Sequence, residues 1–123
     1  MSEIVLWIIS GLLAVVFLMA GAMKAMQPKA KLAENMAWVE DFSDMQVKGI
    51  GILEILGAIG LILPMLTGIA PILTPLAAVG LVLTMVGAAI THIRQGDEIQ
   101  QTIPSVVLGV LALVAAIGWF GVV

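Results

Sequence analysis

Residues 49–64 read GIGILEILGAIGLILP, and one carboxylic acid, Glu54, stands there among glycines and aliphatic side chains. Moving a carboxylate out of water without a partner carries a large free-energy cost. The apolar run that begins at Gly49 nevertheless continues to Leu66, and it has the length and composition of a membrane-spanning helix. The stretch therefore predicts a spanning helix whose acid has a basic or hydroxyl partner on a neighbouring segment.

The composition of the whole chain also indicates a membrane protein. Of its 123 residues, 62% are hydrophobic and 11% are charged, whereas about a quarter of the residues in a soluble domain are charged. One domain of this size cannot bury so much apolar surface, so the excess must face the lipid bilayer. The net charge of −3 and the lack of a basic patch in the sequence exclude a nucleic-acid partner.

Three further apolar runs have spanning length: residues 4–25, 71–93 and 103–123. Pro64, Pro71 and Pro75 indicate a short turn between the second run, residues 49–66, and the third. We therefore expect an all-α membrane protein, a four-transmembrane-helix bundle that forms a single domain over residues 1–123.

The placement of charge predicts an orientation for the four spans. All five basic residues fall on one side of the spans: Lys24, Lys29, Lys31, Lys48 and Arg94. The other side carries the N-terminus with Glu3, an uncharged turn and an uncharged C-terminus. The positive-inside rule then places both longer connections in the cytoplasm and both termini outside it.

The connection after the first span, residues 31–45, has an amphipathic pattern of its own. Apolar residues recur there at helical spacing, opposite acidic ones: Leu32, Met36, Val39 and Phe42 against Glu34, Glu40 and Asp41. The pattern predicts a short amphipathic interfacial helix with Trp38 at headgroup level. It suits equally a solvent-exposed helix that caps the bundle.

Small and polar residues within the spans indicate where the helices meet. Five glycines are expected to allow close approach of two backbones: Gly21, Gly57, Gly60, Gly80 and Gly87. The alternating direction of the spans brings Lys24, Glu54 and His92 toward the cytoplasmic side, where a Lys24–Glu54 ion pair is geometrically available. Thr84 and Thr91 lie on the same stripe of the third span as His92 and complete a candidate polar pocket.

Each ionisable residue of this pocket also has a purely structural interpretation. Glu54 can serve only to pair helices, Lys24 can extend to the lipid headgroups, and His92 can be an ordinary histidine at the membrane surface. The sequence identifies no catalytic residue. Because cysteine is absent, disulfides, thiolate nucleophiles, iron–sulfur clusters and a Cys-pair quinone reductase are excluded. A lone histidine with scattered carboxylates lacks a metal-ligand set, so we expect no metal and no cofactor of the chain's own, although the pocket is compatible with a quinone.

The motif AWVEDF at residues 37–42 and the run from residue 47 to residue 98 resemble the DoxX-like family of small bacterial membrane proteins. The resemblance extends from about Leu12 to the C-terminus. The matching positions are polar or small residues at set depths in apolar runs, together with one tryptophan: Gly21, Lys24, Trp38, Glu54, Gly57, Gly60, Pro64, Pro75, Gly87, Ala88 and His92. The resemblance implies a four-helix membrane bundle, as the composition does.

The resemblance also implies a location in the bacterial inner membrane and partners within it. Relatives include subunits associated with thiosulfate:quinone oxidoreductase and proteins of oxidative-stress complexes. Other membrane subunits or further copies of the chain are therefore the expected partners. The basic cluster that usually follows the third span is reduced here to Arg94, which argues against an anion contact at that point.

Three functions are compatible with these residues. The first is an accessory or binding subunit of a redox or energy-converting membrane complex, which contacts quinone or lipid through the polar pocket and has no enzymatic activity on its own. The alternative is a subunit of a quinone-linked oxidoreductase in which Glu54 and His92 relay protons. The third is a small proton-coupled exporter, although such exporters carry their glutamate in the first helix and need balanced charge on the two sides.

Overall fold

All regular structure in the described part of the chain is helical. The computed structural model describes residues 2–33, 42–96 and 99–123. Its helices are, in chain order, α1 (Glu3–Met26), α2 (Lys29–Leu32), α3 (Asp44–Thr67), α4 (Leu73–Arg94) and α5 (Ile99–Val122). Four of them, all except α2, are long and apolar enough to cross a membrane, which confirms the predicted four-helix membrane fold.

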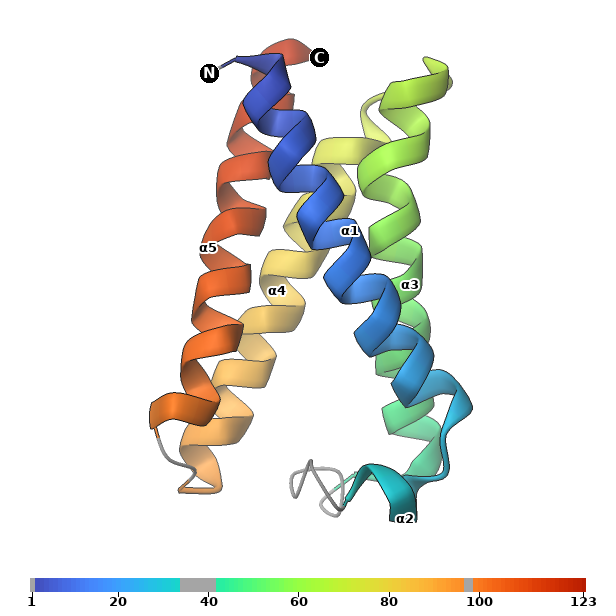
Figure 1. The fold of residues 1–123 in the computed structure, drawn as a ribbon, viewed down its shortest axis with the longest axis vertical. Helices are drawn as coiled ribbons and strands as arrows, with labels where there is room; N and C mark the ends of the chain where they lie inside the picture. The colour runs from blue at the N-terminus through green and yellow to red at the C-terminus, as the bar shows by residue number, and fades with distance from the viewer. Residues whose placement is uncertain (1, 34–41, 97–98) are drawn as a thin grey trace.

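The four long helices form a closed ring of antiparallel neighbours. The most extensive contacts join α1 to α3 and α4 to α5, and smaller contacts between α3 and α4 and between α1 and α5 complete the ring. Both chain termini lie at one end of the bundle, and α2 lies at the other (Figure 1). Toward the α2 end, the α1–α3 pair and the α4–α5 pair diverge in this view.

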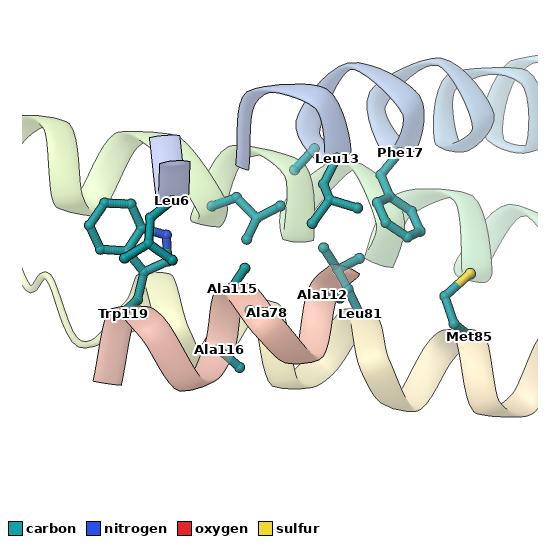
Figure 2. Close-up of a cluster of buried hydrophobic side chains, with 12 residues drawn as sticks. Leu6, Leu13, Phe17, Ala78, Leu81, Met85, Ala112, Ala115, Ala116 and Trp119 are labelled. Carbon is teal, nitrogen blue, oxygen red and sulfur yellow. The ribbon is translucent and has the colours of Figure 1, made fainter. Parts of the chain in front are cut away.

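The main core lies in the half of the bundle that carries the termini. Leucine and phenylalanine side chains of α1 pack against alanines of α5, and α3 and α4 supply the opposite side (Figure 2). The buried members of this core are Leu6, Leu13, Phe17, Ala58, Leu61, Ala78, Leu81, Met85, Ala112, Ala115, Ala116 and Trp119. Dispersion contacts of this kind, rather than the hydrophobic effect, hold helices together in lipid. The terminal half is therefore the tightly packed part of the bundle.

The outer surface of the bundle is apolar on every long helix. Many large aliphatic side chains are exposed there, among them Ile8, Leu12, Leu53, Leu56, Leu83 and Ile117. An apolar surface of this extent is unfavourable in water and suits contact with lipid chains. The bundle therefore presents hydrocarbon outward.

A hydrogen bond between two fully buried side chains links α1 to α5. Trp119 Nε1 donates to Ser10 Oγ at 2.9 Å, and neither residue is exposed. The ring of Trp7 meets that of Trp119 edge to face, with centroids 5.0 Å apart. The indole N–H thus has an acceptor where no water or lipid could supply one.

Replacing Ser10 by alanine is expected to lower the free energy of unfolding by about 1 kcal/mol, because the Trp119 N–H then lacks an acceptor. The measurement is unfolding of the purified protein by a denaturing detergent added to a mild one. In a Trp119→Phe background the donor is absent, so the same serine change should cost much less. An equal cost in both backgrounds would show that the hydrogen bond is not responsible.

A second polar contact joins α3 to α4 next to a proline. Pro64 lies within this helix and has no N–H to donate. One residue later, the backbone N–H of Met65 donates to Thr74 Oγ1 on α4 at 3.2 Å. Thr74 itself is fully buried. α3 continues past Pro64 to Thr67, and the Met65–Thr74 hydrogen bond ties this last part of the helix to α4.

Two helices begin earlier than the apolar runs predict. α3 starts at Asp44 rather than near Gly49, because Ser43 and Gln46 form a capping box that satisfies the first backbone N–H groups. α5 starts at Ile99 rather than at residue 103. In both cases a polar first turn extends the helix beyond its apolar part.

The predicted interfacial helix falls mostly outside the described residues, with Met36, Trp38 and Val39 among those not covered. At its two ends, Leu32 and Phe42 are described. Leu32 is buried against Val47, and Phe42 packs on the same small cluster. The ends of this connection therefore rest on the first turns of α3.

Candidate functional site

The polar site begins where α1 and α3 touch backbone to backbone. A Cβ atom built on Gly21 would lie 2.5 Å from the carbonyl oxygen of Gly51, and one built on Gly51 would lie 2.6 Å from the carbonyl oxygen of Gly21. Both distances are below 3.0 Å, a separation that real Cβ atoms essentially never show. Only glycine fits at these two positions, and the close approach brings the next turns of both helices together.

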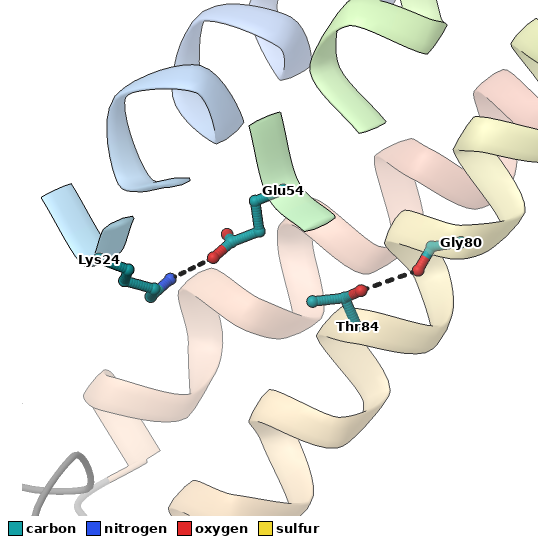
Figure 3. Close-up of polar contacts among 4 residues, drawn as sticks. All are labelled: Lys24, Glu54, Gly80 and Thr84. Carbon is teal, nitrogen blue, oxygen red and sulfur yellow. Dashed lines mark hydrogen bonds and ion pairs between the residues drawn. The ribbon is translucent and has the colours of Figure 1, made fainter. Parts of the chain in front are cut away.

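The ion pair that the sequence allowed is present one turn from this glycine contact. Lys24 Nζ donates to Glu54 Oε1 at 2.6 Å (Figure 3). The Glu54 side chain is 2% exposed and that of Lys24 is 12% exposed. The distance is that of a charge-assisted hydrogen bond, which is stronger than a neutral one and is needed to keep a carboxylate in a low-dielectric region.

Thr84 lies opposite Glu54 on the neighbouring helix. Glycines of α3 set the register with α4: a Cβ on Gly60 would meet Ala77, and one on Gly57 would meet Leu81. One turn further along both antiparallel helices, the same register places Glu54 opposite Thr84. Figure 3 shows Thr84 on the α4 ribbon in the same close-up as the ion pair.

The two threonines of the predicted pocket bond back to their own helix. Thr84 Oγ1 donates to the carbonyl oxygen of Gly80 at 2.9 Å, and Thr91 Oγ1 donates to that of Gly87 at 2.9 Å. Each hydroxyl has thereby used its only hydrogen, while its oxygen can still accept hydrogen bonds. Both side chains are half-buried.

The predicted pocket is only partly assembled around the ion pair. Lys24 and Glu54 are in contact and Thr84 is level with them. Thr91 lies about two turns further along α4 than Thr84, toward the α2 end of the bundle. His92 is half-buried in the last turn of α4, next to Thr91 in the chain. The ion pair therefore forms the centre of the site, with Thr84 on the neighbouring helix and with Thr91 and His92 further toward the α2 end.

Two of the five predicted packing glycines have a different role. Gly21, Gly57 and Gly60 lie at helix contacts, whereas a Cβ built on Gly80 or Gly87 would meet no atom within 4 Å among the described residues. The expectation that these two pack against another helix of the chain is therefore corrected. Their carbonyl oxygens instead accept the hydroxyl hydrogens of Thr84 and Thr91.

Replacing Gly80 or Gly87 by alanine is accordingly expected to be tolerated. The new methyl group meets open space, and alanine favours the helix by up to about 1 kcal/mol over glycine. Denaturing-detergent titration of the purified protein should show unchanged or slightly raised stability for each variant. A marked loss would contradict this and would indicate that the glycine contacts another chain.

Several residues of the fold were not anticipated from the sequence. Gly51, the partner of Gly21, has a recognisable signal, since it lies one turn from Glu54 on the same face of α3. The Ser10–Trp119 and Met65–Thr74 hydrogen bonds have no such signal, because each joins residues whose neighbourhood depends on how the helices pack.

The five basic residues all lie at the end of the bundle that carries α2. Lys24 is in the last turn of α1 and Arg94 ends α4, and α2 contains Lys29 and Lys31. Lys48, in the first turns of α3, contacts Asp44 at 3.2 Å, with side chains that are 40% and 59% exposed. The site therefore lies nearer the basic end of the bundle than the end with the termini.

Comparison with known proteins matches the chain to one family. A model of the family described as DoxX-like matches residues 8–121, which is nearly the whole chain. No curated protein and no solved structure was found to match it.

Proposed function

The chain belongs to the DoxX-like family, and on that basis we propose that it is an accessory or binding subunit of a redox or energy-converting complex in the bacterial inner membrane. The observation that carries the proposal is the Lys24–Glu54 ion pair, which is almost wholly buried on two spanning helices. Ionisable groups within a bilayer are costly to maintain and commonly serve binding or proton transfer. In this proposal the pair and Thr84 hold the polar head of a quinone or lipid.

Partner subunits are expected to contact the chain within the membrane. Large apolar side chains face outward on all four spanning helices, for example Leu12, Leu53, Leu83 and Ile117. The described connections between the helices are short by comparison. Lateral helix contacts therefore offer more surface to a partner subunit than these connections do.

The test is copurification from native membranes. The chain is tagged at its exposed C-terminus, solubilised in a mild detergent and recovered, and the bound proteins and lipids are identified by mass spectrometry. We expect membrane subunits of one redox or energy-converting complex. The matched control is Lys24→Met/Glu54→Met, which removes both charges together and should reduce recovery of any ligand held by the pair. A homogeneous monomer or homodimer at every detergent strength would contradict the proposal.

A proton relay in a quinone-linked enzyme is the second candidate, because Glu54 is a buried acid with a cationic neighbour. The threonine hydroxyls do not extend a relay from it, since they donate to Gly80 and Gly87. The test is Glu54→Gln in the isolated complex. Quinone turnover that is unchanged by this substitution would remove the candidate.

We also propose that the α2 end of the bundle faces the cytoplasm, because all five basic residues lie there. The chain has no cysteine, so single cysteines at Ser2 and at Lys31 can be labelled without background. A membrane-impermeant thiol reagent added to intact cells should label Ser2→Cys strongly and Lys31→Cys only after permeabilisation. The reverse pattern would invert the proposed orientation.

A further inference from the structure

The Glu54 carboxylate has one oxygen engaged and one available. Oε1 accepts the hydrogen bond from Lys24, and within the described part of the chain Oε2 accepts none. Yet no buried polar side-chain atom among the described residues lacks a partner, so Oε2 is not sealed from the molecular surface. Figure 3 shows this oxygen beside the ion pair with no contact drawn to it. The site thus presents a strong hydrogen-bond acceptor.

The other polar groups at this level are also acceptors. Thr84 has given its hydroxyl hydrogen to Gly80, which leaves its oxygen able to accept. Thr91, nearer the α2 end, donates its hydroxyl hydrogen to Gly87 in the same way, so its oxygen can also accept. The ammonium of Lys24 is directed at Glu54. A head group that donates a hydroxyl hydrogen therefore finds at least two acceptors here, Glu54 Oε2 and Thr84 Oγ1.

The charge of the site limits the ligand further. Lys24 and Glu54 neutralise each other on spanning helices. A ligand with a net charge would bring an uncompensated ion to a low-dielectric region, at a large cost. The favoured ligand is therefore neutral.

We propose that this site selects a neutral, membrane-soluble molecule whose head donates its hydroxyl hydrogen to Glu54 Oε2, as an alkylated phenol does, with Thr84 Oγ1 on α4 as the second acceptor available to that hydrogen. The inference deepens the proposed function, since it concerns the same site, and it specifies the chemistry of the ligand. For a redox pair, Glu54 Oε2 can accept a hydrogen bond from the reduced, hydroxyl-bearing form, whereas the oxidised quinone has no hydrogen to donate to it.

The test compares two ligands that differ only in the donor. Purified protein in phosphatidylcholine nanodiscs is equilibrated with radiolabelled para-octylphenol or with its methyl ether, and empty nanodiscs of the same lipid are the background. We expect the phenol to bind about tenfold more tightly than the ether, as one hydrogen bond to a charged acceptor implies. Equal binding, or tighter binding of the ether, overturns the inference.

Two variants assign the preference to the site. Glu54→Gln should bring the phenol and the ether close to parity, and Thr84→Val should lower phenol affinity about threefold to fivefold with little effect on the ether. If Glu54→Gln does not fold, Thr84→Val alone decides. The matched control is Thr67→Val, which removes the same kind of back-bond, to Leu63, at the other end of the bundle. A phenol affinity that Thr84→Val leaves unchanged, or that Thr67→Val lowers equally, overturns the inference.

The outcome is separable from that of the proposed function. If partner subunits copurify but phenol and ether bind alike, this inference fails and the accessory role stands. If the phenol is preferred but no partner is recovered at any detergent strength, the site is supported and the accessory role fails.

Discussion

Replacing Gly51 by alanine is expected to force α1 away from α3 and to lower the free energy of unfolding by about 2–3 kcal/mol. The added methyl group would lie 2.6 Å from the Gly21 carbonyl oxygen and 2.8 Å from the Ala25 nitrogen. Both are backbone atoms, so no side-chain rotation can relieve the overlap. Separation of the two helices would also lengthen the Lys24–Glu54 contact, which this approach brings together.

The control for this change is Gly49→Ala, two residues away on the same helix. No atom lies within 4 Å of a Cβ at that position, so alanine should be neutral or slightly stabilising there. Denaturing-detergent titration, followed by far-UV circular dichroism and by the folded band in gel filtration, measures both variants. If Gly51→Ala were as stable as Gly49→Ala, the close α1–α3 contact would not exist in the membrane protein.

Removing the lysine of the ion pair is expected to lower the free energy of unfolding more than any other polar substitution. Lys24→Met leaves Glu54, whose side chain is 2% exposed, without a partner, and should cost about 3–5 kcal/mol. Glu54→Met should cost less, because the long Lys24 side chain, already 12% exposed, can extend toward the headgroups. The double variant Lys24→Met/Glu54→Met should recover most of the loss, since neither charge remains.

The exposed Lys48–Asp44 pair provides the comparison. Its atoms are 3.2 Å apart, but both side chains are well exposed, so Lys48→Met should change stability by less than about 0.5 kcal/mol. The four stabilities of the Lys24 and Glu54 variants form a double-mutant cycle. Additive single losses in that cycle would rule out a coupled, buried pair.

The polar site was predictable in part because an ionisable residue inside a membrane-spanning helix indicates where a polar partner must lie. An acid in an apolar run requires a partner, and few side chains in this chain can provide one, so Lys24 follows from Glu54 by the direction and length of the spans. Thr84 was expected near the pair for a similar reason, since it lies on a polar stripe of α4. The hydrogen-bond directions of its hydroxyl and of Thr91 could not be predicted, because both depend on whether a neighbouring helix offers a closer acceptor than their own backbone.

The packing glycines were also only partly predictable from the sequence. Gly21, Gly57, Gly60, Gly80 and Gly87 look alike in the sequence, yet only the first three lie at helix contacts within the chain. Which face of a helix meets a neighbour depends on helix rotation, and an apolar run that is hydrophobic all round carries little information about rotation. Small residues therefore indicate that close packing is possible, and the arrangement of the helices decides where it occurs.

By itself, the sequence determined that this protein is a four-helix membrane bundle with its basic residues at one end. It also determined that the bundle contains a buried acid, which requires a basic or hydroxyl partner. Those features depend on transfer free energies, which belong to individual residues and sum along the chain. Only the tertiary structure decided that Gly51 meets Gly21, that Ser10 accepts from Trp119, and that one oxygen of Glu54 is left to accept a further hydrogen bond. These depend on distances between helices remote in sequence, and such distances are set by how all the side chains pack together.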